Sequence, residues 1–334
     1  MAALKNIVIA GASGSLGSIV FKKFVESGKF NIRVLKRAGS ASEFPAGTDV
    51  VEVDYSSLES LKSALQGQDA VISTLTTLAI DAQLTFIDAA IAAGVQRFLP
   101  SEYGSNLDVP SVRQLPVFAQ KVKIQDVLIE KSKSTPLSYT FVYNAAFLDW
   151  GLQHNFILDH SQSKPIIIDG GDVEFSTTTL TSVADALIGV VSHPDETKNR
   201  VVYIHDLITT QNKLLALAKQ VAPERSWAPI PVALDDLTAK ADERLAKGLY
   251  DMETFAPYLF RAIFDPKSGG KFEKTDNELL GVKGKTDQDI IELLKPLLKA
   301  GGWPGHCFTL GIAWLGKAEA GATTVVKTTP GDIG

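Results

Sequence analysis

Residues 6–17 read NIVIAGASGSLG, and this stretch decides the fold. Its first five residues form a short apolar, β-branched run, which predicts a buried strand. A turn with glycines at Gly11, Gly14 and Gly17 follows. Beyond it, apolar side chains recur at helical spacing as far as Phe24, and Gly28 is typical of a helix end. The order strand, glycine-rich turn, helix predicts the first unit of an α/β sheet.

The same alternation continues along the chain. Strand-like runs are expected at residues 32–35, 49–53, 69–74, 97–100 and 138–143, and helices near 58–65, 83–93 and 118–131. Strands that alternate with helices predict right-handed βαβ crossovers and a parallel sheet. The strand runs are continuously apolar, as expected when helices cover both faces. We therefore predict an α/β fold, a Rossmann-type doubly wound parallel sheet with a smaller mixed substrate-binding lobe.

The order of elements becomes less regular after Trp150. We expect residues 1–150 to form the Rossmann domain, and a return of segments from about 165–205 to its sheet is left open as an alternative. Residues 151–300 would form the smaller lobe, largely helical and interrupted at Pro229, Pro231, Pro257 and Pro266. Residues 301–334 are rich in glycine and aromatic residues and then in small polar ones, and we expect a C-terminal extension of undefined packing.

Composition narrows the class of protein. The chain has 334 residues, a formal net charge of −5 and one cysteine. The charge argues against general phosphate neutralisation on nucleic acid and against docking on an anionic membrane. The N-terminus has no signal-like apolar core, and no run of about 18 apolar residues is present. We expect a cytoplasmic protein that binds neither nucleic acid nor membrane, as a monomer or homodimer.

The glycine-rich turn is a candidate phosphate site. Glycine lets the backbone approach a pyrophosphate, and the N-terminus of the next helix directs unpaired N–H groups at that anion. The candidate residues of this loop are Gly11, Ser13, Gly14, Ser15, Leu16 and Gly17. The alternative is a glycine-rich turn that binds nothing. The flanking strand and helix favour a dinucleotide.

The end of the second strand indicates which dinucleotide. No acidic residue occurs between Phe30 and Ser42, although NAD sites usually place a carboxylate there. Lys36, Arg37 and Ser40 stand there instead and suit a 2′-phosphate, which favours NADP(H). The alternative is a pair of solvated cationic side chains. Asp54 ends the third strand and is a candidate for the adenine side or, equally, for a helix cap.

Further candidates follow the fourth and sixth strands, at the carboxyl edge where open α/β sheets bind ligands. Thr74 and Thr76 are expected to contact ribose or phosphate, with loop capping as the alternative. The backbone at Asn144, Ala145 and Phe147 is expected to hold the nicotinamide carboxamide. Phe147 and Trp150 would line an aromatic substrate site, although a core role for Phe147 fits equally well.

Several other chemistries are disfavoured. None of the seven tyrosines has a lysine four residues later, so the proton-relay pair of ordinary short-chain reductases is absent. The five histidines show no metal-ligand spacing, so no metal site is expected. Ser13 and Ser101 lie in no nucleophile elbow, which argues against serine hydrolysis.

Taken together, the motifs resemble the NmrA-like, isoflavone reductase-like branch of atypical short-chain reductases, and most closely its fungal members. The resemblance rests on GASGSLG, Arg37 at a strand end, RFLPSEYGSN at 97–106, FAQKVKIQ at 118–125, TFVYNAAFLDW at 140–150 and STTTLTSVADALIGVV at 176–191. It spans roughly residues 4–295. Gln125 departs from the family pattern, which usually has arginine there, and Tyr103 stands where the plant members have phenylalanine.

The resemblance implies a function and its residues. It implies a catalytic lysine at Lys121, whose ammonium would also contact the cofactor, although a surface helix lysine is the alternative. Tyr103 is a candidate catalytic donor or an aromatic wall of the substrate site. The implied activity is NADPH-dependent hydride transfer to an enone, quinone methide or carbonyl of a small aromatic or phenolic molecule of secondary metabolism. The alternative is an NmrA-type redox sensor that binds NADP without catalysis.

Overall fold

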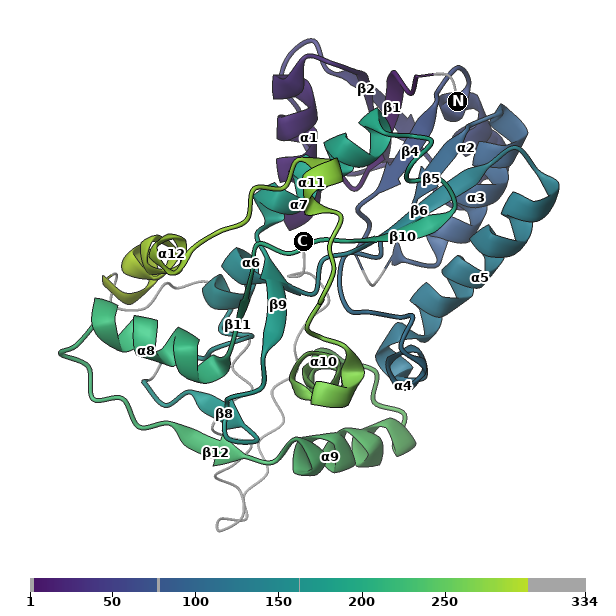
Figure 1. Cartoon of the computed structure of the whole chain (residues 1–334). Helices are drawn as coiled ribbons and strands as arrows, with labels where there is room; N and C mark the ends of the chain where they lie inside the picture. The colour runs from purple at the N-terminus through teal and green to yellow at the C-terminus, as the bar shows by residue number, and fades with distance from the viewer. Residues whose placement is uncertain (1–2, 77–78, 162, 300–334) are drawn as a thin grey trace.

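A seven-stranded, wholly parallel sheet organises the protein (Figure 1). The computed structural model describes residues 3–299 except 77–78 and 162. The strand order is β10-β6-β5-β4-β1-β2-β3. The strands are β1 (Asn6–Ala10), β2 (Asn31–Arg37), β3 (Asp49–Val53), β4 (Ala70–Ser73), β5 (Arg97–Leu99), β6 (Ser138–Tyr143) and β10 (Arg200–Tyr203).

Helices cover both faces of this sheet. The helices α1 (Ser15–Ser27) and α7 (Leu180–Ser192) pack on one face, and α2 (Leu58–Leu65), α3 (Ala82–Ala93) and α5 (Ala119–Ser134) pack on the other. Alternate residues of each strand contribute to the two cores. Ile9 and Ile72 face α1 and α7, whereas Val8 and Val71 face the other layer. The predicted doubly wound α/β fold is confirmed.

A smaller mixed lobe follows β6 in the chain. It contains β7 (Ala146–Phe147), β9 (Phe175–Thr178) and β11 (Leu207–Thr209) in one sheet, and β8 (Ile166–Ile168) beside β12 (Ile230–Val232). The strand β9 pairs antiparallel with β11 and parallel with β7. Its helices are α6 (Leu148–Gln153), α8 (Gln211–Val221), α9 (Leu234–Ala246), α10 (Met252–Phe264) and α12 (Asp287–Lys299). Their apolar faces share a separate core around Phe175, Leu214 and Phe264.

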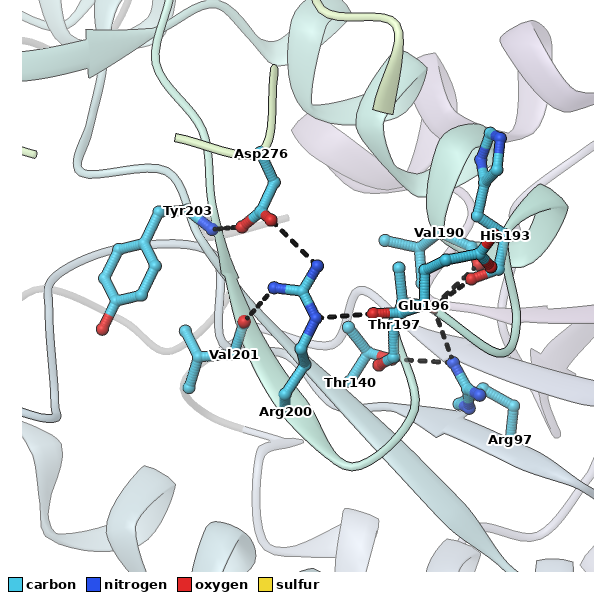
Figure 2. Close-up of polar contacts among 10 residues, drawn as sticks. All are labelled: Arg97, Thr140, Val190, His193, Glu196, Thr197, Arg200, Val201, Tyr203 and Asp276. Carbon is cyan, nitrogen blue, oxygen red and sulfur yellow. Dashed lines mark hydrogen bonds and ion pairs between the residues drawn. The ribbon is translucent and has the colours of Figure 1, made fainter. Parts of the chain in front are cut away.

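The chain returns to the large sheet after entering this lobe. The helix α7 packs against α1, and β10 extends the sheet beside β6. A buried arginine fastens this return (Figure 2). Arg97 of β5 is 0% exposed and donates to Ser138 Oγ at 2.8 Å, Thr140 Oγ1 at 2.9 Å and Thr197 Oγ1 at 3.0 Å. Its third nitrogen donates to the carbonyl of Pro194, in the loop before β10.

A second arginine holds the outer side of β10 (Figure 2). Arg200 donates to the Glu196 carbonyl and forms an ion pair with Asp276 at 2.8 Å. Asp276 also accepts the backbone N–H of Tyr203 and precedes the short helix α11 (Asn277–Leu280), which packs on α7. Hydrogen bonds and an ion pair from these side chains therefore hold β10 and the segments beside it, which come late in the chain, against strands that come earlier.

The interruption predicted at Pro257 is wrong. Pro257 lies inside α10, which continues to Phe264. The residues on both sides of it are buried, so packing against the lobe compensates for the hydrogen bond that proline cannot donate. The predicted extension at 301–334 lies outside the described residues. Within the described part of the chain, no helix is both long and apolar enough to span a membrane.

Candidate active site

The parallel sheet gathers the candidate residues at one edge. The segments after β1, β4, β5 and β6 all leave the sheet at its carboxyl end, and these four strands are neighbours in the order β6-β5-β4-β1. Residues that are far apart in the sequence therefore meet at one edge, where open α/β sheets bind ligands. The glycine loop, Thr74, Tyr103 and Asn144 all belong to these segments.

The glycine loop fits a closely packed turn. Gly11 has φ of +83°, and a Cβ atom there would lie 2.7 Å from the carbonyl oxygen of Thr74. Gly14 is the N-cap of α1 and provides no side-chain cap. The first N–H groups of α1 therefore lack a side-chain acceptor, and helix N-termini of this kind can bind an anion. Ser13 and Ser15 are exposed and Leu16 is half-buried, so the hydroxyls are open to solvent.

Thr74 supports this loop from β4. Its hydroxyl donates to the Ala10 carbonyl at 2.8 Å, and the residue is 8% exposed. A Cβ atom at Gly17 would lie 2.6 Å from that hydroxyl. Thr74 thus joins the ends of β1 and β4 and sets the space in which the loop turns. Thr76 is exposed, and its carbonyl accepts the Ala79 N–H.

The two cations at the end of β2 differ in their surroundings. Lys36 forms an ion pair with Glu52 of β3 at 2.8 Å. Arg37 is exposed and has no ion pair with any described residue. Ser40 donates its hydroxyl to Ser42 at 3.0 Å, and its N–H donates to the Arg37 carbonyl. Arg37 is therefore the cation that is free to meet a phosphate.

Asp54 begins a turn ahead of α2. Its carboxylate accepts the N–H of Ser56 at 2.9 Å and the hydroxyl of Ser56 at 2.6 Å, and these bonds lower the pKa of the carboxyl. Ser57, not Asp54, is the N-cap of α2, since Ser57 Oγ accepts the N–H of Ser60. Asp54 remains exposed at the carboxyl end of β3.

Lys121 reaches the edge from α5. Its Nζ donates a hydrogen bond to the backbone carbonyl of Glu102, in the segment after β5. A Cβ atom at Gly104 would lie 3.8 Å from Nζ, an ordinary contact distance, so the amine lies next to the backbone of Gly104. Burial lowers the pKa of the Lys121 ammonium, and the charge of Glu102 opposes this shift. Lys123, two residues later, is exposed.

Tyr103 is strained, and its hydroxyl has no hydrogen-bond partner in the described part of the chain. The residue has φ of +25°, a region that non-glycine residues rarely adopt, and it is 8% exposed. Its hydroxyl is buried without a hydrogen bond among the described residues. Burial raises the pKa of the phenol, as does the Glu102 charge, so the group is a neutral donor. An unpaired buried donor in the segment after β5 fits contact with a bound ligand.

Sequence reasoning missed the polar network behind Lys121. Burial raises the pKa of the Glu102 carboxyl to about 7, and Lys121, Gln125 and Arg113 oppose the shift. Arg113 of the short helix α4 (Pro110–Arg113) donates to Gln125 Oε1 at 2.7 Å. Gln125 Nε2 in turn donates to the Tyr143 hydroxyl at 2.9 Å. The departure at Gln125 was the available signal, because a glutamine there needs polar partners when buried.

The segment after β6 is fixed by its own backbone. The N–H groups of Asn144 and Ala145 both donate to the Gly104 carbonyl, and Thr178 Oγ1 donates to the Asn144 carbonyl. Ala145 has φ of +54°. Asn144 Oδ1 is buried and unpaired among the described residues, which leaves a side-chain acceptor at this edge. The predicted contact through backbone therefore competes with bonds already made, whereas Oδ1 is free.

The candidate aromatic residues lie at the start of the smaller lobe. Phe147 ends β7 and is half-buried against the core under α1 and α7. Trp150 is half-buried on α6 and stacks on His154 with ring centroids 4.3 Å apart. Across residues 3–76, 79–161 and 163–299, no group of three or more histidine, cysteine or acidic residues is arranged to hold a metal.

A sequence model described as the NmrA-like family matches residues 3–255. The chain belongs to the NmrA-like family. The resemblance seen in its motifs is thereby confirmed. The match spans the glycine loop, the Glu102–Gly104 segment, Lys121 and the segment after β6, so every part of the site described above lies within the family region.

Curated relatives of this NmrA-like protein include fungal and plant proteins. It is 33% identical over 300 residues to Oxidoreductase aprR of Aspergillus flavus, covering 87% of this chain and 99% of the relative. It is 30% identical over 296 residues to Oxidoreductase poxI of Penicillium oxalicum, covering 84% and 91%. Among solved structures, AtPrR2 with NADP+ and (+)pinoresinol superposes with a TM-score of 0.72 at 24% identity, covering 89% and 99%. That likeness confirms the fold.

Proposed function

We propose that this NmrA-like protein is an NADPH-dependent reductase of a small aromatic or phenolic molecule. The observation that carries the proposal is the position of Lys121, whose amine reaches the Glu102 carbonyl at the same sheet edge as the uncapped N-terminus of α1. Relatives at 30% identity or more are named oxidoreductases, and a solved neighbour holds NADP+ with pinoresinol. Both support a reductase with a cofactor of this class.

The residues present fit NADP(H). The glycine loop and the first N–H groups of α1 would bind the pyrophosphate, Arg37 the 2′-phosphate, and Asn144 Oδ1 the carboxamide N–H. When bound, the cofactor supplies a hydride at the nicotinamide C4. Lys121 would donate a hydrogen bond to the substrate oxygen on which negative charge develops, and Tyr103 would supply a second, neutral donor. Phe147 and Trp150 would contact the aromatic ring of the substrate.

The test follows NADPH consumption with phenolic enones, aryl ketones and quinone methides, using cofactor deuterated at C4. We expect deuterium in the product and a loss of about 10²-fold or more in kcat for Lys121→Met. Lys123→Met is the matched control on the same helix and should keep wild-type kcat, because Lys123 is exposed. Tight NADPH binding without turnover of any compound would favour the sensor function instead.

A further inference from the structure

Glu102 brings a buried carboxyl into the surroundings of Lys121. The residue is 3% exposed, and its own backbone carbonyl accepts the Nζ hydrogen bond. That bond fixes the amine beside the residue whose side chain carries the opposite charge. The two side chains interact coulombically rather than through a hydrogen bond. In a buried environment such an interaction is weakly screened.

The neighbouring elements provide the remaining charges. From α4, Arg113 acts on Glu102 and pairs with Asp126 on the outer side of α5. From β6, Tyr143 lies within the electrostatic reach of Glu102 and donates to Asp108 at 3.5 Å. Tyr103 follows Glu102 directly in the chain and is a neutral phenol. Lys121 and Arg113 are thus the cations that favour the ionised carboxylate, and burial opposes it.

Gln125 joins these parts. It lies one helical turn after Lys121 on α5, is 2% exposed, and bridges the Arg113 guanidinium and the Tyr143 hydroxyl. Gln125 also forms a side-chain hydrogen bond with the Glu102 carboxyl, and this contact lowers the pKa of that carboxyl. The glutamine side chain carries no charge of its own. The positive charge nearest to it is on Arg113, which lies on the far side of the Gln125 amide from Glu102. The carboxylate therefore faces one near cation, Lys121, and one cation behind Gln125.

We propose that Glu102 is a positioning residue that keeps the Lys121 ammonium charged at the reaction edge, with Gln125 and Arg113 holding the carboxyl in its ionised form. This role rests on the proposed reductase function. A charged lysine donates a stronger hydrogen bond to a developing oxyanion than a neutral amine does. Removal of the carboxylate should make Lys121 easier to deprotonate, because burial then acts on the ammonium without compensation.

The first measurement is the pH profile of kcat/KM. In the wild type we expect an alkaline limb where Lys121 loses its proton. Protonation of Glu102 near pH 7 removes the negative charge but leaves the ammonium charged, so this pair gives no acid limb. In Glu102→Gln the alkaline limb should move down by about one pH unit. Glu130→Gln is the matched control, since Glu130 is exposed on α5, the helix that carries Lys121, and pairs with Lys133. It should leave the alkaline limb unchanged.

The second measurement does not depend on turnover. Protein labelled with ¹³C at lysine Cε is titrated by NMR, and Lys121→Arg identifies the signal of Lys121. We expect the pKa of Lys121 to fall in Glu102→Gln and to stay at the wild-type value in Glu130→Gln. An unchanged Lys121 titration in Glu102→Gln would overturn the positioning role even if the enzyme reduces its substrate. A shifted titration without any turnover would support the coupling and reject the reductase.

Arg113→Gln is the second variant, in case Glu102→Gln fails to fold. Arg113 is half-exposed, and its removal takes away one of the cations that stabilise the carboxylate. The pKa of the Glu102 carboxyl, followed by NMR of protein labelled with ¹³C at glutamate Cδ, should then rise, with little change in KM for NADPH. A Glu102 pKa at the wild-type value would contradict the role given to Gln125 and Arg113.

Discussion

Gly11 and Gly17 face each other across the start of α1, and a Cβ atom on Gly17 would lie 2.0 Å from the carbonyl oxygen of Gly11. The same Gly11 carbonyl accepts the N–H of Gly14 at 3.1 Å, so it has little freedom to move. The helix can approach β1 this closely because Gly17 has no side chain. The loop that we assign to phosphate binding therefore depends on two glycines for shape.

We predict that Gly17→Ala destabilises the protein by about 1–3 kcal/mol and weakens NADPH binding, because the loop must open to admit the methyl group. Gly14→Ala is the control. Its Cβ would lie 3.5 Å from the Gly11 oxygen, an ordinary contact, and Gly14 has φ of −75°. Thermal unfolding and calorimetric titration with NADPH measure both effects. Equal losses in the two variants would contradict the packing argument.

Arg37 and Lys36 are predicted to differ in cofactor selection. Arg37→Gln should weaken NADPH binding by about 10–100-fold and leave NADH binding unchanged, since an exposed guanidinium is free to hold a 2′-phosphate. Lys36→Gln should have a smaller effect, because Glu52 already occupies Lys36. Fluorescence titration of the wild type and of each variant with NADPH and with NADH gives the dissociation constants to compare. A larger effect at Lys36 would reverse the assignment.

Tyr103→Phe is predicted to separate stability from activity. The hydroxyl is desolvated without a partner in the described structure, so its removal should leave the free energy of unfolding unchanged or slightly higher. Activity should fall by about tenfold if the hydroxyl donates to bound substrate. Tyr143→Phe should behave differently, with a loss of about 1 kcal/mol in stability, because it removes the contacts to Gln125 and Asp108. Urea unfolding and steady-state kinetics distinguish the two.

Arg97→Met is predicted to be the most destabilising substitution outside the site, at about 3 kcal/mol. It leaves Ser138, Thr140 and the Pro194 carbonyl without the donor that they share. Arg200→Met should lose less, about 1 kcal/mol, since its ion pair with Asp276 is partly exposed. Denaturant midpoints with a constant slope would measure the difference. Similar midpoints would show that burial of Arg97 adds little.

The large sheet could be predicted because its strands carry their own signal. The runs that became β1 and β4 are apolar on both faces, so their burial is visible in the sequence itself. The strands β7, β9 and β11 have two to four residues, too few to show a period. They exist because partners elsewhere in the chain pair with them, which no local pattern encodes.

Some residues of the candidate site could be predicted from the sequence, and others could not. The glycine loop was visible because glycine spacing encodes backbone shape, and Lys121 because it matches a family motif. Glu102 was not singled out, because the local sequence SEYG gives no sign that the carboxyl is buried. Arg113 lies twelve residues from Gln125, and only the packing of α4 on α5 brings them together. Burial and long-range pairing are tertiary properties, so these roles emerge only in the folded chain.

The return of α7 and β10 to the large sheet has a consequence for protein engineering. The smaller lobe is not a cassette inserted at one junction, because the chain passes between it and the sheet repeatedly, before α7, after β10 and again around α11 (Figure 1). A chimera that exchanges everything after residue 150 would also replace the helix that covers α1 and the strand beside β6. Recombination between family members should therefore succeed with lobe segments exchanged separately, while 180–204 stay with the parent that provides the sheet.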